Sequence, residues 1–199
     1  MQIRKERKDA IEHRQIILQK AQSLFTEYGV DSVTMHQIAK SAGIGQGTLY
    51  RRYAHKGEIC QDLMKESSED LCEEIQSFLE NNKLLPIKER LTTALQICLD
   101  FIELHSHWLI SIQAPTFECR QELMYKSPMY KFLHNKFYEL LYEAESSFIE
   151  ADKDANFRAD TMLASMNPEL YLFMKSERGY TKEEIKDKLV RLYIDPLFL

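Results

Sequence analysis

The strongest constraint in this 199-residue sequence is a pair of short helical patterns joined by a glycine-rich turn. The first pattern covers about residues 34–41. It begins at Thr34, and Gln37 stands three positions later, a spacing typical of a capping box in which each side chain satisfies a free backbone amide. The turn at 42–47 holds three of the chain's six glycines, and a second helical pattern follows at 48–53. Two short helices that meet at a tight turn predict a helix-turn-helix.

The rest of the sequence also repeats its apolar residues at helical spacing, and it lacks the alternating patterns and hairpin turns of strands. A first helix is expected to stop at Gly29, a residue that accepts the left-handed conformation past a helix end. Later helical patterns cover 55–81, a stretch from Pro86, 129–148, 162–174 and a last segment around 185–192. We therefore expect an all-α fold of about nine helices. It would comprise a three-helix helix-turn-helix domain over 1–54 and a helical bundle over 55–199.

Charge is divided unevenly along the chain, although the formal net charge is only −5. Residues 1–60 hold ten basic and six acidic side chains, whereas residues 61–199 hold sixteen and twenty-five. A basic module joined to an acidic body predicts a polyanionic partner for the first part alone. The basic run at residues 4–8, taken by itself, is equally typical of a solvated helix end.

The second helix of the motif offers a face suited to DNA. Ile44 and Leu49 would anchor this helix to the core, while Gly43 turns the chain. The residues then left for DNA are Gln46 for a base edge, Gly47 for close backbone approach, Thr48 and Tyr50 for phosphates, and Arg51 and Arg52. Because neighbouring residues lie about 100° apart around a helix, one arginine would address a base and the other a phosphate.

These residues resemble the TetR family of bacterial transcriptional regulators. The matching string is Thr34, Ile38-Ala39, Ala42-Gly43-Ile44, Gly47-Thr48-Leu49-Tyr50, Tyr53 and Lys56, preceded by Ala21, Phe25 and Gly29. The resemblance covers residues 8–60 strongly and the rest in helical layout and length. It implies DNA contacts at Thr34, Gln46, Gly47, Thr48, Tyr50 and Lys56; alternatively, Thr34 is only a cap and Tyr50 only a packing residue. The chain departs from the family at Arg52, Tyr53 and Gly57, where relatives often carry Tyr or His, Phe, and an acidic residue.

The resemblance also implies a small-molecule pocket in the C-terminal body. The aromatic side chains in the stretches that would line it are Phe101, His105, Trp108, Phe137 and Tyr138. Seventeen of the chain's aromatic residues follow residue 60, and the alternative is that they form an ordinary bundle core.

Two apolar stripes near the C-terminus predict an interface between two copies of the chain. The residues expected there are Met162, Met166, Phe173, Leu189, Leu192 and Tyr193. A large exposed apolar patch usually finds a partner, and two-fold pairing would match a palindromic operator. In the alternative interpretation, one stripe packs on the bundle and only the other is free.

Other classes of function find little support. No nucleophile and base are placed together, so no enzyme is expected, and the acidic pairs Glu73-Glu74, Glu143/Glu145 and Glu183-Glu184 are expected on solvated faces. The spacing of histidines and cysteines predicts no metal site, and the cysteines are expected to be reduced, mostly buried thiols. The glycine cluster lacks the lysine and the preceding strand of a nucleotide-binding loop.

No stretch is long and apolar enough to span a membrane, and no apolar segment follows the basic start as a signal peptide would require. We expect a cytoplasmic, one-component transcriptional regulator without a cofactor. It would be a ligand-responsive repressor that binds double-stranded operator DNA as a homodimer and releases it when a small-molecule inducer binds. The alternative is a helical ligand-binding or interaction protein with a vestigial DNA module.

Overall fold

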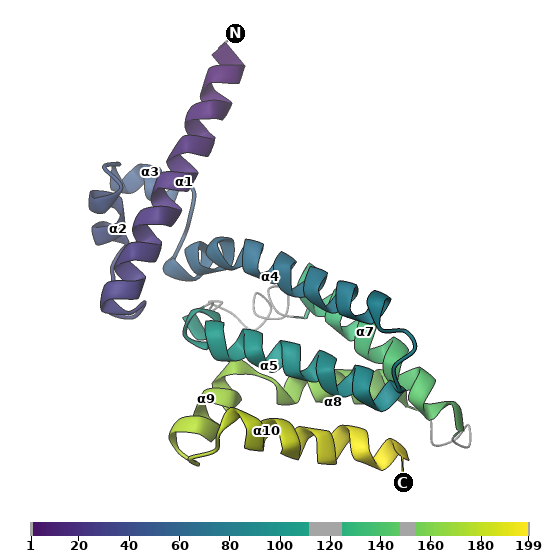
Figure 1. Cartoon of the computed structure of the whole chain (residues 1–199). Helices are drawn as coiled ribbons and strands as arrows, with labels where there is room; N and C mark the ends of the chain where they lie inside the picture. The colour runs from purple at the N-terminus through teal and green to yellow at the C-terminus, as the bar shows by residue number, and fades with distance from the viewer. Residues whose placement is uncertain (1, 112–124, 148–153, 199) are drawn as a thin grey trace. The chain divides into compact units, whose positions relative to one another are not determined.

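The computed structural model describes residues 2–111, 125–147 and 154–198 of the chain. Every regular element in these ranges is helical, with nine α-helices, labelled in Figure 1, and three short 3-10 or π-helical turns. The prediction of an all-α fold is confirmed. Across the same ranges, no helix combines the length and the apolar character needed to cross a lipid bilayer.

The chain divides into two compact units. The first segment of unit 1 ends at Glu66, inside α4 (Lys56–Asn81), and the end of α5, from His107 on, also belongs to unit 1. The end at Glu66 lies beyond the boundary expected after Ala54. The reason is that the first turns of α4 supply Ile59 and Cys60 to the core of unit 1, where both are fully buried. The assignment of DNA binding to residues 1–54, and of ligand binding and dimer formation to residues 55–199, stays a prediction.

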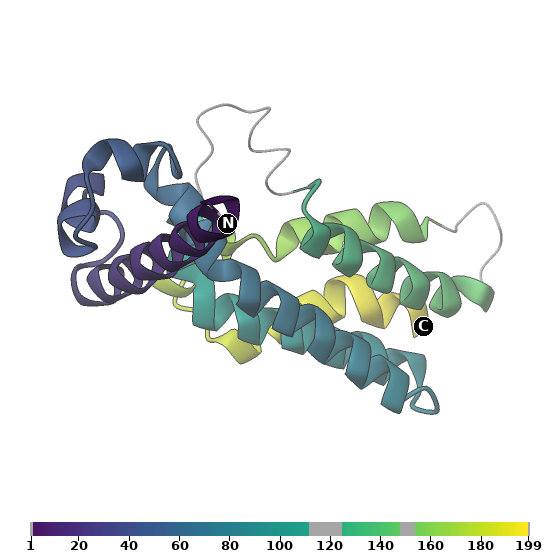
Figure 2. The same ribbon diagram turned by 90° about the horizontal axis from the view of Figure 1, so that it is seen from above.

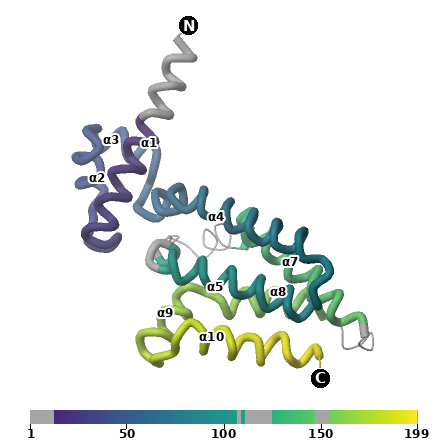
Figure 3. Tube along the Cα trace, viewed as in Figure 1, coloured from purple at the N-terminus to yellow at the C-terminus, as the bar shows by residue number. Residues whose placement is uncertain are grey.

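Unit 1 contains α1 (Gln2–Tyr28), α2 (Met35–Ser41), α3 (Gln46–Tyr50) and the start of α4. Within it, α2 lies against α1 and α3 lies against α2 (Figures 1 and 3). As predicted, α1 stops before Gly29, whose φ of +77° is in the left-handed region that favours glycine.

The core of unit 1 takes one apolar face from each of its helices. Its buried side chains are Ile17, Ala21, Phe25, Val33, Met35, Ile38, Ala39, Leu49, Tyr53, Ile59 and Cys60. Helices as short as α2 and α3 are unstable alone in water, so this packing is what holds them in place.

Unit 2 packs the second half of α4 with the helices that follow. These are α5 (Ile87–Ser111) as far as Ser106, α7 (Pro128–Ala144), α8 (Ala155–Ser165), α9 (Pro168–Ser176) and α10 (Lys182–Leu189). Short helical turns follow α7 at Glu145–Ser147, and α10 at Val190–Ile194 and Asp195–Phe198. Helices α7 and α8 lie side by side (Figure 2).

The apolar segment expected over 162–174 is two helices in the structure. The side-chain oxygen of Asn167 accepts from the amides of Glu169 at 2.8 Å and Leu170 at 3.2 Å, which caps the start of α9. Pro168 follows at the first turn, where its missing N–H costs nothing. The cap and the proline together separate α8 from α9.

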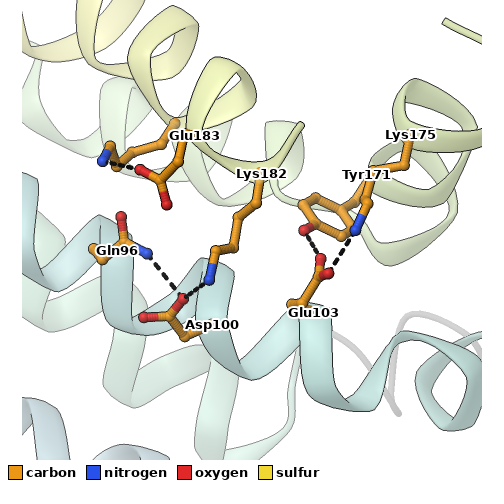
Figure 4. A network of polar contacts seen from close by, with 8 residues as sticks. Gln96, Asp100, Glu103, Tyr171, Lys175, Lys182 and Glu183 are labelled. Atoms are coloured by element: carbon orange, nitrogen blue, oxygen red, sulfur yellow. Dashed lines mark hydrogen bonds and ion pairs between the residues drawn. The ribbon is translucent and has the colours of Figure 1, made fainter. Parts of the chain in front are cut away.

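Polar contacts fasten α9 and α10 to α5 (Figure 4). The ammonium group of Lys182 lies 2.6 Å from the carboxylate of Asp100. Glu103 binds both the Lys175 ammonium group and the Tyr171 hydroxyl. The bond from Lys175 and then that from Tyr171 hold the pKa of Glu103 below its usual value. These contacts supplement an apolar core to which Tyr171 itself belongs, with 1% of its surface exposed.

One acidic residue expected on a solvated face is buried instead. Glu145 is fully buried, and its carboxylate lies 2.7 Å from the Nε of Arg158 on α8. A buried carboxylate is costly without an opposite charge, so the Arg158 guanidinium accounts for its place there. Glu143, by contrast, lies at the surface and pairs with Arg90.

Candidate nucleic-acid interface

Thr34 and Gln37 form the predicted capping box at the start of α2. The Thr34 hydroxyl accepts from the Gln37 amide at 3.2 Å, and the Gln37 side-chain oxygen accepts from the Thr34 amide at 2.7 Å. The two bonds satisfy backbone groups that the first turn of a helix leaves free. Thr34 itself is exposed, so it is a cap that also faces solvent.

The turn between α2 and α3 depends on one glycine conformation. Gly43 has a φ of +68°, which a residue with a side chain adopts only at a cost. The turn is closed by a 3.0 Å hydrogen bond from the Ile44 amide to the Ala39 carbonyl. Leu49, completely buried, then anchors α3 to the core. The turn and this anchor fix the direction of the short helix.

The other side of α3 carries an exposed polar face. Gln46, Gly47 and Tyr50 are exposed, Tyr50 with 52% of its surface, and Thr48 is half-buried. No other part of the described chain comes within 4 Å of the place where a side chain would begin at Gly47. A partner's backbone or a base pair can therefore approach this position closely.

Arg51 and Arg52 follow α3 rather than lying on it, because the helix ends at Tyr50. The backbone keeps a helical conformation at Arg51, and the assignment of one arginine to a base and the other to a phosphate stays a prediction. The Arg51 side chain folds back, with its Nε donating to the Gly47 carbonyl at 3.2 Å and an Nη to the Thr48 hydroxyl at 3.3 Å. Arg52 is exposed.

Lys56, predicted as a phosphate contact, has a structural role in unit 1. Its ammonium group donates to the carbonyls of Val30 at 2.6 Å and Asp31 at 3.1 Å, in the connection between α1 and α2. The ammonium group has three N–H donors, so one stays available for a phosphate.

Three residues that the sequence did not single out as a group meet between α1 and α4. Asp62 accepts from the Nε of Arg14 at 2.7 Å and from the Tyr53 hydroxyl at 2.6 Å. Burial acts to raise the pKa of Asp62, but the bonds from Arg14 and Tyr53 outweigh it, so the pKa lies below its usual value. Burial and the bond to Asp62 raise the pKa of Tyr53. The one sequence feature that points to this cluster is Tyr53, at a position where the family that the chain resembles usually has Phe.

A contact between α2 and α3 was also not predictable from the sequence. The side-chain nitrogen of Gln46 on α3 contacts the Nδ1 of His36 on α2, and both residues are exposed. Ten residues separate them, and no spacing rule links positions on two different helices. The pair lies on the face predicted to read DNA.

The aromatic residues predicted to line a ligand pocket have different surroundings. Phe101 and His105 are half-buried with their rings 4.7 Å apart, and burial lowers the pKa of His105. Phe137 is almost completely buried in the unit 2 core, whereas Tyr138, next to it on α7, is 38% exposed. The Trp108 side chain lies outside the described part of the structure. Phe101 and His105 are therefore neighbours on α5, and Phe137 belongs to the core cluster against which Phe101 packs.

A pocket of about 410 Å³ lies elsewhere in unit 2, between α8 and the C-terminal turns. Its lining residues are Asp154, Phe157, Arg158, Thr161, Leu192 and Tyr193. Two large apolar side chains of this lining are exposed, Phe157 with 62% of its surface and Leu192 with 63%. The six lining residues together form an open groove, which we call the α8 groove.

The α8 groove contains two of the six residues predicted for a dimer interface, Leu192 and Tyr193. Phe173 on α9 is exposed but lies outside it. Met162, Met166 and Leu189 are buried in the unit 2 core, so nearly all of their apolar surface is already covered within one copy of the chain.

Of the three cysteines that the structure describes, two are buried and Cys72 is half-buried. Cys60 and Cys98 are buried thiols, and burial raises the pKa of each to about 12, which makes both poor nucleophiles. Within the ranges that the structure describes, no group of three His, Cys, Asp or Glu residues could hold a metal ion. Cys119 lies outside those ranges.

Sequence comparison identifies relatives that share this arrangement. Residues 17–63, which include α2, α3 and the start of α4, match the model for "Bacterial regulatory proteins, tetR family". An HTH-type transcriptional regulator of Staphylococcus aureus strain MRSA252 is 32% identical over 193 residues, covering 96% of this chain and 97% of the relative.

Solved structures share the fold over nearly the whole chain. FadR of Thermus thermophilus, a TetR-family repressor in complex with lauroyl-CoA, has a TM-score of 0.72 at 18% identity and covers 94% of this chain and 95% of its own. FadR of Bacillus subtilis in complex with stearoyl-CoA has a TM-score of 0.65 at 18% identity, with coverages of 90% and 97%. At these identities the likeness concerns the fold alone.

Proposed function

Because the chain belongs to the TetR family of bacterial regulatory proteins, we propose that it is a ligand-responsive repressor that binds palindromic operator DNA as a homodimer. It acts as a transcription factor and not as an enzyme. Its place of action is the cytoplasm, where bacterial operators lie.

The observation that carries the proposal is the two-sided character of α3. One side is fixed by Leu49, which is fully buried, and by the left-handed turn at Gly43. The opposite side exposes Gln46, Gly47 and Tyr50. A rigidly held short helix with a polar outer face is the element that a helix-turn-helix places in the major groove.

Dimer formation is assigned to the α8 groove. Phe157 and Leu192 expose apolar surface that a monomer would leave in water, and a second copy of the same groove would cover it. Two-fold pairing of identical surfaces supplies the symmetry of a palindromic operator, with reading helices about 34 Å apart.

The ligand is proposed to bind in unit 2 beside Phe101, His105 and Phe137. Two of the proteins with the same fold were solved with acyl-CoA, so acyl-CoA thioesters are the first compounds to test. Ligand binding would favour a subunit arrangement in which the two reading helices no longer match successive major grooves. Addition of lauroyl-CoA should then raise the unfolding temperature and release DNA. Release of DNA without a rise in the unfolding temperature would contradict the proposed link between ligand binding and DNA release. A rise in the unfolding temperature without release of DNA would contradict it as well.

The DNA-binding proposal is tested by site selection from a random double-stranded library, together with fragments flanking the protein's own gene. We expect one enriched sequence with two symmetric half-sites, bound at least about 10³-fold more tightly than random DNA at the same salt concentration. Equal affinity for all sequences would contradict the proposal and favour a ligand-binding protein with a vestigial DNA module.

A further inference from the structure

The contact between His36 and Gln46 lies on the exposed face of unit 1, and the capping box and the α2–α3 turn do not need it. His36 is the second residue of α2 and Gln46 is the first of α3. Their neighbours Met35 and Leu49 are buried, so both backbones are held by the core. The contact therefore orients a side chain and not a helix.

The atoms in contact determine which way the Gln46 carboxamide is presented. In this orientation the Gln46 Nε2 donates one N–H to the Nδ1 of His36, an arrangement that goes with the His36 tautomer whose proton is on Nε2. One N–H of Gln46 is thereby used within the protein. When His36 accepts from the N–H that lies anti to the carbonyl oxygen, the oxygen and the second N–H remain free, and these two groups share one edge of the amide.

A donor and an acceptor on one edge match adenine in the major groove, which presents the N7 acceptor and the N6 amino donor. Guanine presents two acceptors, N7 and O6, and would need two donors. The reversed amide, with its oxygen toward His36, would offer both N–H groups and suit guanine better. The orientation of the Gln46 amide thus decides between two purines.

We propose that His36 is a specificity-determining residue that fixes the Gln46 carboxamide for adenine at one position of each operator half-site. The proposal rests on the proposed function, because it requires α3 to read DNA. His36 acts by positioning Gln46. The accessible space beside Gly47 is where the base pair would approach.

Two substitutions of His36 separate the effect of its hydrogen bond to Gln46 from the effect of its side-chain size. His36→Asn keeps an acceptor close to the position of Nδ1, whereas His36→Leu keeps the size and removes the acceptor. Both replace an exposed side chain, so thermal unfolding should change little in either. Gln46→Ala identifies the base-pair position that Gln46 reads, because preference is lost there alone.

The test is site selection with the wild-type protein and these variants, followed by affinity measurements on sites that differ only at the Gln46 position. We expect wild type and His36→Asn to prefer adenine over guanine there by about tenfold. His36→Leu should lose most of this preference and keep its preference elsewhere. In the Gln46→Ala background, His36→Leu should have no further effect on base preference.

Three results would overturn the proposal, and they can be told apart. If His36→Leu retains the adenine preference, His36 does not position Gln46. If it weakens binding to all sequences equally, its role is structural support of α2. If the wild-type protein selects no sequence at all, the proposed DNA-binding function fails, and this inference fails with it.

Discussion

The hydroxyl of Tyr53 donates a 2.6 Å hydrogen bond to the carboxylate of Asp62 on α4. Asp62 also accepts from Arg14 on α1. Together the three side chains join α1, the segment after α3, and α4 within one unit. A phenylalanine at position 53 would pack in the same place but could not make this connection.

Tyr53→Phe should therefore lower the free energy of unfolding of unit 1 by about 1.5–3 kcal/mol, the usual net value of a hydrogen bond to a charged group. Urea denaturation followed by circular dichroism measures it. Tyr50→Phe is the matched control, since the Tyr50 ring is half exposed. Equal stability of Tyr53→Phe and wild type would show that the bond to Asp62 contributes nothing measurable.

Comparison of the wild-type protein with Asp62→Asn measures how the stabilisation by the Asp62 carboxylate depends on pH. The pKa of Asp62 is lowered in the folded state, so its carboxylate stabilises the fold above the pKa of the unfolded chain. That contribution is lost as the pH falls below about 4. The stability difference between wild type and Asp62→Asn should be largest near pH 7 and shrink in acid. A difference that grows in acid would contradict the assignment.

Lys56→Ala tests whether this lysine supports the fold, contacts phosphate, or does both. Loss of the bonds to Val30 and Asp31 should lower the unfolding temperature. Loss of one phosphate contact should weaken binding to specific and random DNA alike and reduce the salt slope by about one unit. Lys83→Ala, in the loop before α5, removes the same charge as a control. An unchanged slope with reduced stability would leave Lys56 as a purely structural residue.

If the chain dimerises through the α8 groove as proposed, Leu192→Glu should yield a monomer, because it places a charge in that groove. Leu192 is 63% exposed, so unit 2 should remain folded by circular dichroism. Leu104→Glu on α5, where the leucine is 75% exposed, is the control and should leave the dimer intact. Sedimentation velocity distinguishes the two. A Leu192→Glu protein that remains dimeric would place the interface outside the groove.

Local features of the fold were predictable because they depend on a few neighbouring residues. The capping box of Thr34 and Gln37 lies within one helical turn, and its spacing alone identifies it. The same holds for the helix end at Gly29 and the turn at Gly43, both of which require a positive φ. These features determine α2 and the path of the turn that leads to α3.

Contacts between distant residues were not predictable in the same way. Arg14 and Asp62 are 48 positions apart, and only the packing of α1 on α4 brings them together. Apolar spacing likewise showed that Met162 and Leu189 lie on apolar faces without showing what covers those faces. The structure covers both residues with the unit 2 core and leaves Leu192 exposed.

The most direct measurement is the affinity of Tyr50→Ala for the selected operator, taken together with its thermal unfolding. Tyr50 is 52% exposed on the outer face of α3. Removal of its ring should therefore weaken specific binding by about 1–3 kcal/mol and leave the unfolding temperature nearly unchanged. Tyr28→Ala, at an equally exposed tyrosine near the end of α1, serves as the control and should bind as wild type does. Undiminished operator binding by Tyr50→Ala, or a parallel loss of folding, would contradict the assignment of α3 as the DNA-reading helix.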